Sequence, residues 1–249
     1  SMISRIPLAF KAPFIIAGSA ILLAAGIAAY SLHAGTLTAL HAADDKLKAI
    51  LDDRSQTLTH YLSSIEQDAR VIAQAPQTTD AIKAFAKGWD EIANPERELQ
   101  DAYIFDNPHG IGKKEYLTKT LAETQYDSAH GKYHPWFRSF LWERGYYDIF
   151  LFDPDGNLIY TVVKERDFAT NLITGKYRGT DLGNAFRAAA KETAPGALHF
   201  FDFKPYALSN GAPASFLSTP IIENGSLIGV LAFQMPAARI NEIMKRDSG

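Results

Sequence analysis

Aromatic and charged side chains that together could hold a small molecule gather between Tyr133 and Tyr206. Small-molecule pockets combine aromatic walls with a few charged groups. Arg138 would offer a planar fork to a carboxylate, whereas Asp167 or Asp202 would neutralise an amine. Any one of these residues is equally well explained as core or solvated loop, so the prediction concerns the set. The predicted ligand-binding residues are Tyr133, Trp136, Arg138, Tyr147, Tyr160, Lys164, Asp167, Asp202 and Tyr206.

Residues for covalent or metal chemistry do not recur at a recognisable spacing, so we predict no catalytic residue, metal or cofactor. Asp153 and Asp155 flank a proline where a turn requires Asp or Asn in any case. Of the seven histidines, only His130 and His134 are spaced to share a helix face, and Pro135 beside them argues against a zinc site. The absence of cysteine excludes disulfides and thiolate ligands.

The composition is that of an ordinary protein surface around a hydrophobic core. The 249 residues carry a net charge of −3, and 47% of them are hydrophobic. No basic field favours nucleic acid, and we expect no nucleic-acid partner. The length suffices for one large domain or two small ones.

An uncharged apolar segment, residues 13–32, reads PFIIAGSAILLAAGIAAYSL and is long enough to span a bilayer. Arg5 and Lys11 precede it, and acidic residues follow it. The positive-inside rule therefore predicts a cytoplasmic N-terminus (1–12), a transmembrane helix (13–32) and a remainder outside the cytoplasm. The alternative is a cleaved signal peptide, but the apolar run exceeds the usual core of about 7–15 residues.

A long helix is predicted from Thr36 to Ala75, because this segment lacks Gly and Pro and is followed by Pro76. Apolar residues recur every seven positions along it. They are Leu51, Leu58, Ile65 and Ile72, with Leu47, Leu62 and Ala69 between them. Two interpretations are open: a stalk that pairs with a second copy in a homodimer, or a helix that packs only on its own chain.

Further helices are predicted up to residue 144. One begins with a cap among Thr78, Thr79 and Asp80, and a second covers 96–104 after Asn94-Pro95. A third covers Ser128 to Arg144, with a break near Pro135 and an end at Gly145.

Two hairpins, one helix and one further strand follow. Strands are predicted from runs of apolar, β-branched and aromatic residues, and hairpins from the turn residues between these runs. The expected strands are Tyr146–Phe152, Leu158–Val163, His199–Phe203, Ala214–Ile222 and Leu227–Gln234, with helices at 180–191 and 237–246.

The order of these elements resembles CACHE-type extracytoplasmic sensors, and three stretches resemble the sensory region of bacterial methyl-accepting chemotaxis receptors. The stretches are Tyr133–Leu172 (YHPWFRSFLWERGYYDIFLFDPDGNLIYTVVKERDFATNL), Asp181–Ala189 (DLGNAFRAA) and Leu227–Met244 (LIGVLAFQMPAARINEIM). The resemblance implies a PAS-like antiparallel sheet that binds a small molecule, usually within a dimer. The family's amine-recognition pattern is not reproduced, Gln234 stands where the last strand usually ends with an aspartate, and no signalling module follows.

The expected architecture is therefore α+β, with an N-terminal transmembrane helix, a stalk and helical portion (36–144), a PAS-like module of about five strands (145–235) and an exit helix (236–249). The expected function is ligand sensing for a membrane chemoreceptor, with the chain as part of a longer receptor. The expected ligand is a small molecule, such as one with a carboxylate. The alternatives are the sensor of a histidine kinase or cyclase, or a membrane-tethered periplasmic enzyme.

Overall fold

A computed structural model describes residues 8–245. The first seven residues of the predicted cytoplasmic segment, and the last four of the predicted exit helix, lie outside this range. The chain divides into two compact units, one up to Gln56 and one from Thr57 onward. One helix, α1 (Leu8–Gln74), contributes to both units.

The first unit consists of the N-terminal part of α1. Among the described residues, one helix is long and apolar enough to cross a membrane, and its apolar segment lies here. Further along the same unit, Leu47 and Leu51 are 55% and 54% exposed. These two members of the heptad seam thus lack a partner surface within the described chain.

The second unit buries the C-terminal part of α1. Ile65, Ala69 and Ile72 are almost fully buried in a core that includes residues of the sheet. Of the two interpretations of the heptad seam, packing on the same chain therefore holds for this part of α1, and a homodimer stays a prediction for the exposed part of the seam.

Helix α2 (Pro76–Asp90) follows α1 after a single residue, Ala75. The predicted caps among residues 78–80 are wrong, since Ala75 occupies the N-cap position and offers no side-chain bond. The fixed φ of proline suits the first helical position, so the helix starts earlier than a capping side chain would indicate. The next helix, α3 (Pro95–Gln100), is capped by Asn94 and continues into a π-helical turn, η2 (Asp101–Phe105).

Helix α4 (Gln125–Arg144) runs unbroken through Pro135, so the predicted break is wrong. A capping box of Thr124 and Asp127 fixes its start, and Gly145 ends it with a left-handed φ of 70°. Proline removes one hydrogen bond from a helix. The buried face, which includes Phe137 and Leu141, packs in the core and holds the helix together across that defect.

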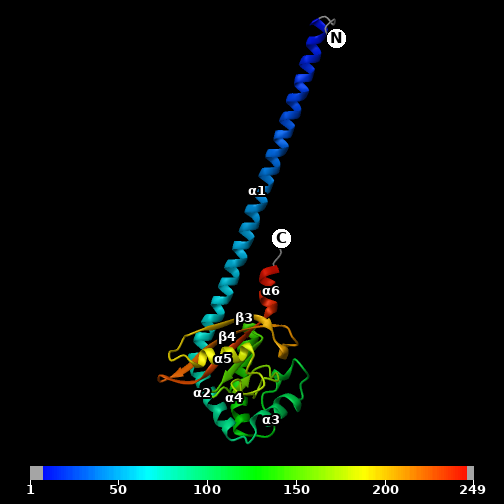
Figure 1. The fold of residues 1–249 in the computed structure, drawn as a ribbon. Coiled ribbons are helices and arrows are strands. Elements are labelled where there is room, and N and C mark those ends of the chain that lie inside the picture. The colour runs from blue at the N-terminus through cyan, green and yellow to red at the C-terminus, as the bar shows by residue number, and fades with distance from the viewer. Residues whose placement is uncertain (1–7, 246–249) are drawn as a thin grey trace. The chain divides into compact units, whose positions relative to one another are not determined.

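The five strands form one antiparallel sheet in the order β2-β1-β5-β4-β3, which confirms the predicted PAS-like sheet (Figure 1). Each consecutive pair of predicted hairpin strands is paired as expected. The strands are β1 (Asp148–Phe152), β2 (Leu158–Thr161), β3 (His199–Pro205), β4 (Pro213–Glu223) and β5 (Ser226–Met235).

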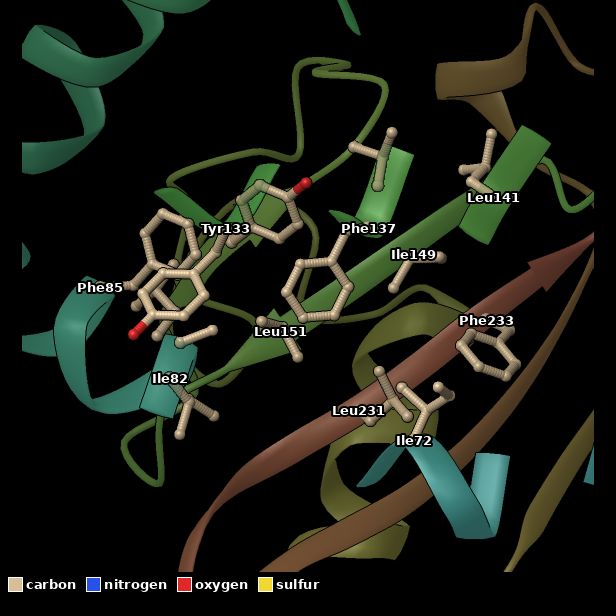
Figure 2. Close-up of a cluster of buried hydrophobic side chains, with 14 of the residues drawn as sticks. Ile72, Ile82, Phe85, Tyr133, Phe137, Leu141, Ile149, Leu151, Leu231 and Phe233 are labelled. Atoms are coloured by element: carbon tan, nitrogen blue, oxygen red, sulfur yellow. The ribbon is translucent and has the colours of Figure 1, made fainter. Parts of the chain in front are cut away.

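Both faces of the sheet are covered. Ile149 and Leu151 of β1 face a core shared with α2, α4 and the end of α1, as Figure 2 shows. Phe150 and Phe152 face the opposite core with α5 (Asp181–Ala190), because successive strand residues point to opposite faces. Short η3 (Lys114–Tyr116) and η4 (Ala207–Ser209) turns and α6 (Ala237–Lys245) complete the described chain.

Candidate ligand-binding site

A buried carboxylate, that of Asp148, lies at the start of β1. The residue is 0% exposed, and its Oδ1 accepts hydrogen bonds from the backbone N–H groups of Ile149 (2.7 Å), Val162 (3.0 Å) and Val163 (3.1 Å). It therefore ties β1 to the segment that leaves β2. The sequence prediction missed Asp148, although a charged residue directly before the apolar run IFLF was a usable signal.

Lys164 follows β2 with a left-handed φ of 64°, and its side chain is buried. Its Nζ donates to the carbonyl oxygen of Thr161 and lies over the rings of Tyr160 (4.4 Å) and Phe168 (5.0 Å). Burial lowers the pKa of Lys164 to about 7, against the opposing field of Asp148. An aromatic box thus holds an amine beside a carboxylate.

Asp167 and Tyr206 meet across two loops. Tyr206 Oη donates to Asp167 Oδ2 at 2.7 Å, and both side chains are buried. Burial raises the pKa of Asp167 to about 6, although the bond from Tyr206 opposes the rise. This contact joins the segment after β2 to the end of β3, so these two members of the predicted ligand-binding set lie together.

Tyr147 and Glu165 form the exposed edge of the same cluster. Tyr147 Oη donates to Glu165 Oε1 at 2.5 Å, and Tyr147 is 38% exposed. Burial raises the pKa of Glu165 to about 7. Behind this pair, Gln234 is the cross-strand partner of Asp148, so the two side chains share a face of the sheet. Its Nε2 donates to Ser209 Oγ at 3.1 Å.

Four buried oxygens of this cluster accept no hydrogen bond from any residue that the structure describes, and we call them the open acceptors. They are Asp148 Oδ2, Glu165 Oε2, Asp167 Oδ1 and Gln234 Oε1. Burying a polar atom without a partner costs free energy, so nearly all such atoms in folded proteins are paired. Four of them in one cluster indicate a site that something else completes.

The fold saturates another buried carboxylate, that of Asp127. Its oxygens accept bonds from Tyr103 Oη (2.5 Å), Thr120 Oγ1 (2.6 Å) and Thr124 Oγ1 (2.8 Å). Burial would raise the pKa of Asp127, yet these bonds outweigh it and lower the pKa. The fold thus satisfies the buried carboxylate of Asp127 completely. Among the described residues, buried oxygens without a hydrogen bond also occur singly outside the cluster, at Glu115 and Asp181, so the distinguishing feature of the cluster is that four of them lie together.

The aromatic box reaches α4 through two histidines. His134 Nδ1 lies 2.7 Å from Tyr160 Oη and its Nε2 lies 2.6 Å from the carbonyl oxygen of Glu115, while His130 stacks on it at 4.3 Å. Burial lowers the pKa of His134 to about 2, so its ring is neutral. Within residues 8–245, no group of three His, Cys, Asp or Glu side chains is placed to hold a metal ion.

Arg138 is engaged elsewhere. Its Nη1 donates to the carbonyl oxygens of Glu115 (3.1 Å) and Tyr116 (3.3 Å), and its guanidinium lies 5.2 Å from the ring centre of Trp142. The loop before α4 thus supplies carbonyl partners for part of the guanidinium, and the role of Arg138 as a fork for a carboxylate stays a prediction. Its Nε remains buried without a described acceptor.

The predicted set is thus brought together only in part. Tyr147, Tyr160, Lys164, Asp167 and Tyr206 belong to the cluster through the contacts above. The other members are placed differently: Tyr133 packs against Phe85, Trp136 against Phe137 and Phe140, and Asp202 is exposed and accepts a bond from the N–H of Phe203. Asp148, Glu165 and Gln234 are members of the cluster outside the predicted set, although Gln234 was already noted as a departure from the family's last strand.

Two surface pockets, of about 370 and 540 Å³, are lined by other residues. Tyr61, Arg144 and Arg239 line the smaller one, and residues of α6 line the larger one. Beside the smaller pocket, Arg144 Nε lies 2.5 Å from Asp68 Oδ2, and Tyr146 Oη donates to the same oxygen. The chain that enters β1 is therefore bonded to α1.

We expect the stability of the Asp167→Asn variant, relative to the unaltered protein, to rise with pH. The folded-state pKa of Asp167, about 6, exceeds the ordinary value of 3.8. The cost of the buried charge is thus absent below about pH 4 and complete above about pH 6. Asparagine removes it, so the variant should gain up to about 3 kcal/mol in unfolding free energy between pH 4 and pH 8. Urea titrations at both pH values measure this gain. The exposed Asp106→Asn is the control, and a pH-independent difference for Asp167→Asn would contradict the prediction.

No family model matches this chain, and no curated protein matches it. It is similar to the sensor domain of the V. cholerae histidine kinase DctB, at 14% identity and a TM-score of 0.48, covering 82% of this chain and 60% of that one. It is also similar to the ligand-binding domain of the Pseudomonas aeruginosa amino acid chemoreceptor PctC in complex with GABA, at 17% identity and a TM-score of 0.34, covering 61% of each chain.

A third similar structure is the ligand-binding domain of the Campylobacter jejuni chemoreceptor Tlp3 in complex with L-norvaline, at 12% identity and a TM-score of 0.37, covering 76% of this chain and 65% of that one. The chain spans less than two thirds of the length of each of the three. Two of these structures are ligand-binding domains of chemoreceptors, and one is the sensor domain of a histidine kinase.

Proposed function

We propose that this chain is the small-molecule-sensing part of a bacterial membrane receptor, with the cluster around Asp148 and Asp167 as its binding site. The observation that carries the proposal is the set of open acceptors, since a ligand would supply the missing partners. The apolar segment of α1 would anchor the chain in the inner membrane and leave the sheet in the periplasm.

The signal would leave the site through the start of β1. Asp148 lies in the site, and Tyr146, two residues earlier, donates to Asp68 of α1. Arg144 strengthens the same link through Asp68 and through Ser64 Oγ at 3.2 Å. A ligand that favours one position of β1 would bias the position of α1 by its differential affinity for the two states. A methyl-accepting chemoreceptor is the output that the sequence resemblance favours, and a kinase or cyclase could receive the same motion.

Binding and transmission can be tested separately on the full chain in lipid nanodiscs. Trp89, Trp136 and Trp142 report unfolding by fluorescence, so a metabolite panel can be screened for compounds that raise the melting temperature. Because the chain has no cysteine, His60→Cys gives a single spin-label site on an exposed position of α1. A binding compound should change the label's spectrum.

The same compound should still bind Asp68→Asn, because Asp68 lies outside the cluster, but the spectral change should shrink. Lys48 forms an exposed ion pair with Asp44, so Lys48→Gln is a control that should leave both the binding of the compound and the spectral change as they are in the unaltered protein. The proposed function is refuted if no compound of the panel raises the melting temperature of the unaltered protein.

A further inference from the structure

The open acceptors share one chemical property. When the carboxylates are ionised, all four oxygens accept hydrogen bonds and none can donate one. Asp148, Glu165 and Asp167 contribute carboxylate oxygens, and Gln234 contributes an amide oxygen. A group that completes this set must donate hydrogen bonds. A carboxylate ligand cannot do so, because an ionised carboxylate only accepts.

The charges of the cluster point the same way. The cluster contains three carboxylates and one buried cation, Lys164, whose Nζ is already bonded to Thr161 and enclosed by aromatic rings. The charge of Lys164 interacts with Asp148 and also with Glu115. The hydroxyl of Tyr147 already donates to Glu165, and that of Tyr206 already donates to Asp167. Arg138, the other cation considered for the site, gives its Nη1 to two loop carbonyls. Once its carboxylates are ionised, the cluster therefore carries an excess of negative charge that Lys164 does not balance.

A route into the cluster begins at its exposed edge. Tyr147 is partly exposed and Glu165 is half-buried, whereas Asp148, Asp167 and Gln234 behind them are buried. A small ligand that replaces the Tyr147–Glu165 bond would enter the cluster at Glu165, its half-buried carboxylate. Two carboxylates in succession, without a cation of their own, suit a ligand with more than one N–H donor.

We propose that the site takes a small organic cation that is rich in N–H donors, such as an alkylguanidinium or a diamine, and that carries no carboxylate. Glu165 and Asp167 provide the charge partners, and Gln234 Oε1 and Asp148 Oδ2 accept the remaining N–H groups. This inference rests on the proposed function and assigns its ligand class. It replaces the carboxylate ligand that Arg138 suggested in the sequence.

The test compares matched probes on the full chain in nanodiscs by calorimetry and by melting temperature. Methylguanidinium and putrescine are the cations, methylurea is the neutral counterpart of the first, and butyrate is the anion. At pH 8 we expect both cations to bind and raise the melting temperature, and methylurea and butyrate to have no effect. The Glu165→Gln/Asp167→Asn double variant should bind the cations at least 30-fold more weakly, while the exposed Asp106→Asn should bind them as the unaltered protein does.

The pH dependence of binding gives a second readout that needs no variant. Protonation of Glu165, Asp167 and Asp148 at low pH removes the charges that attract a cation, and burial raises the pKa of all three. Lys164 becomes more fully charged at low pH and opposes a cation further. The tyrosines that face the cluster stay neutral, because burial raises their pKa values too. Cation affinity should therefore fall at least tenfold from pH 8 to pH 5.

The outcomes separate this inference from the proposed function. Binding of butyrate, equal binding of methylurea and methylguanidinium, or cation binding that the double variant retains at full strength would each overturn the cation assignment and leave a sensor of another ligand. If neither cation binds at 10 mM and pH 8, the cation assignment is also overturned, and the metabolite panel then decides whether the proposed function survives. A double variant that fails to fold leaves the pH series to decide, and an affinity that does not fall at low pH refutes the inference.

Discussion

Replacing Ile65 by aspartate is expected to unfold the sheet-containing unit, whereas the same replacement at Leu51 should leave it folded. Both residues belong to one heptad seam of α1, fourteen positions apart in the sequence. Ile65 is 1% exposed and packs in the core, so the Ile65→Asp variant would combine a lost apolar contact with a buried charge. The expected cost is on the order of 5 kcal/mol, comparable to the whole stability of a small domain.

The Leu51→Asp control changes a side chain that is 54% exposed, and its effect on unfolding should stay within about 0.5 kcal/mol. Denaturant titration followed by tryptophan fluorescence measures both changes. Sedimentation of the Leu51→Asp variant also tests the interpretation of the seam as a homodimer contact, because an exposed seam that pairs two copies should dissociate when it carries charge. Similar stability of the two variants would show that the end of α1 does not belong to the core.

Replacing Asp148 by alanine is expected to cost about 3 kcal/mol or more, and replacing it by asparagine less than about 1 kcal/mol. Alanine removes the oxygen that accepts from the N–H groups of Ile149, Val162 and Val163. Val162 N–H still has the carbonyl oxygen of Ile149 at 3.2 Å, so the loss falls on the N–H groups of Ile149 and Val163. A donor left unsatisfied in the interior costs about 1–3 kcal/mol. Asparagine keeps an oxygen at that position and removes the charge.

The charge itself does not favour folding, because burial and the fields of Asp167 and Glu165 raise the pKa of Asp148. The asparagine variant should therefore match or exceed the unaltered protein in stability above neutral pH. The test compares the unfolding free energies of the alanine and asparagine variants with that of the unaltered protein at pH 8. An equal loss in the two would mean that the carboxylate's charge, and not its hydrogen-bonding oxygen, holds β1 in place.

The sheet could be predicted from the sequence because its signals are local. Asp153–Asn157 and Asn224-Gly225 combine turn residues with flanking apolar runs, and Thr180 precedes a helix that it caps. The unbroken course of α4 could not be predicted, since the packing that overrides Pro135 comes from distant segments. For the same reason, periodicity alone could not tell whether Ile65 faces a second copy or its own core.

The candidate site was predictable as a set of residue types, but not in its electrostatics. Tyr160, Lys164 and Asp167 stand close in sequence, and their proximity in space follows from the turn after β2. The engagement of Arg138 with backbone carbonyls depends on where a loop of irregular structure, residues 106–123, happens to pass. Asp148 lay inside an apparent apolar strand, where the sequence pattern indicated core.

The strand order has a consequence for how the chain is made. β5 lies at the centre of the sheet, between β1 and β4, yet of the five strands of this sheet it is the last along the chain and so the last to be synthesised. Until it emerges, β1 and β4 each expose an unpaired edge, and such edges invite pairing with other chains. Translation that stops before Ser226 would thus release a sheet split into two halves, β2-β1 and β4-β3, that nothing joins. A form of this chain that lacks β5 would therefore present two separate hairpins with unpaired edges, and not one smaller sheet. Such edges are prone to aggregation.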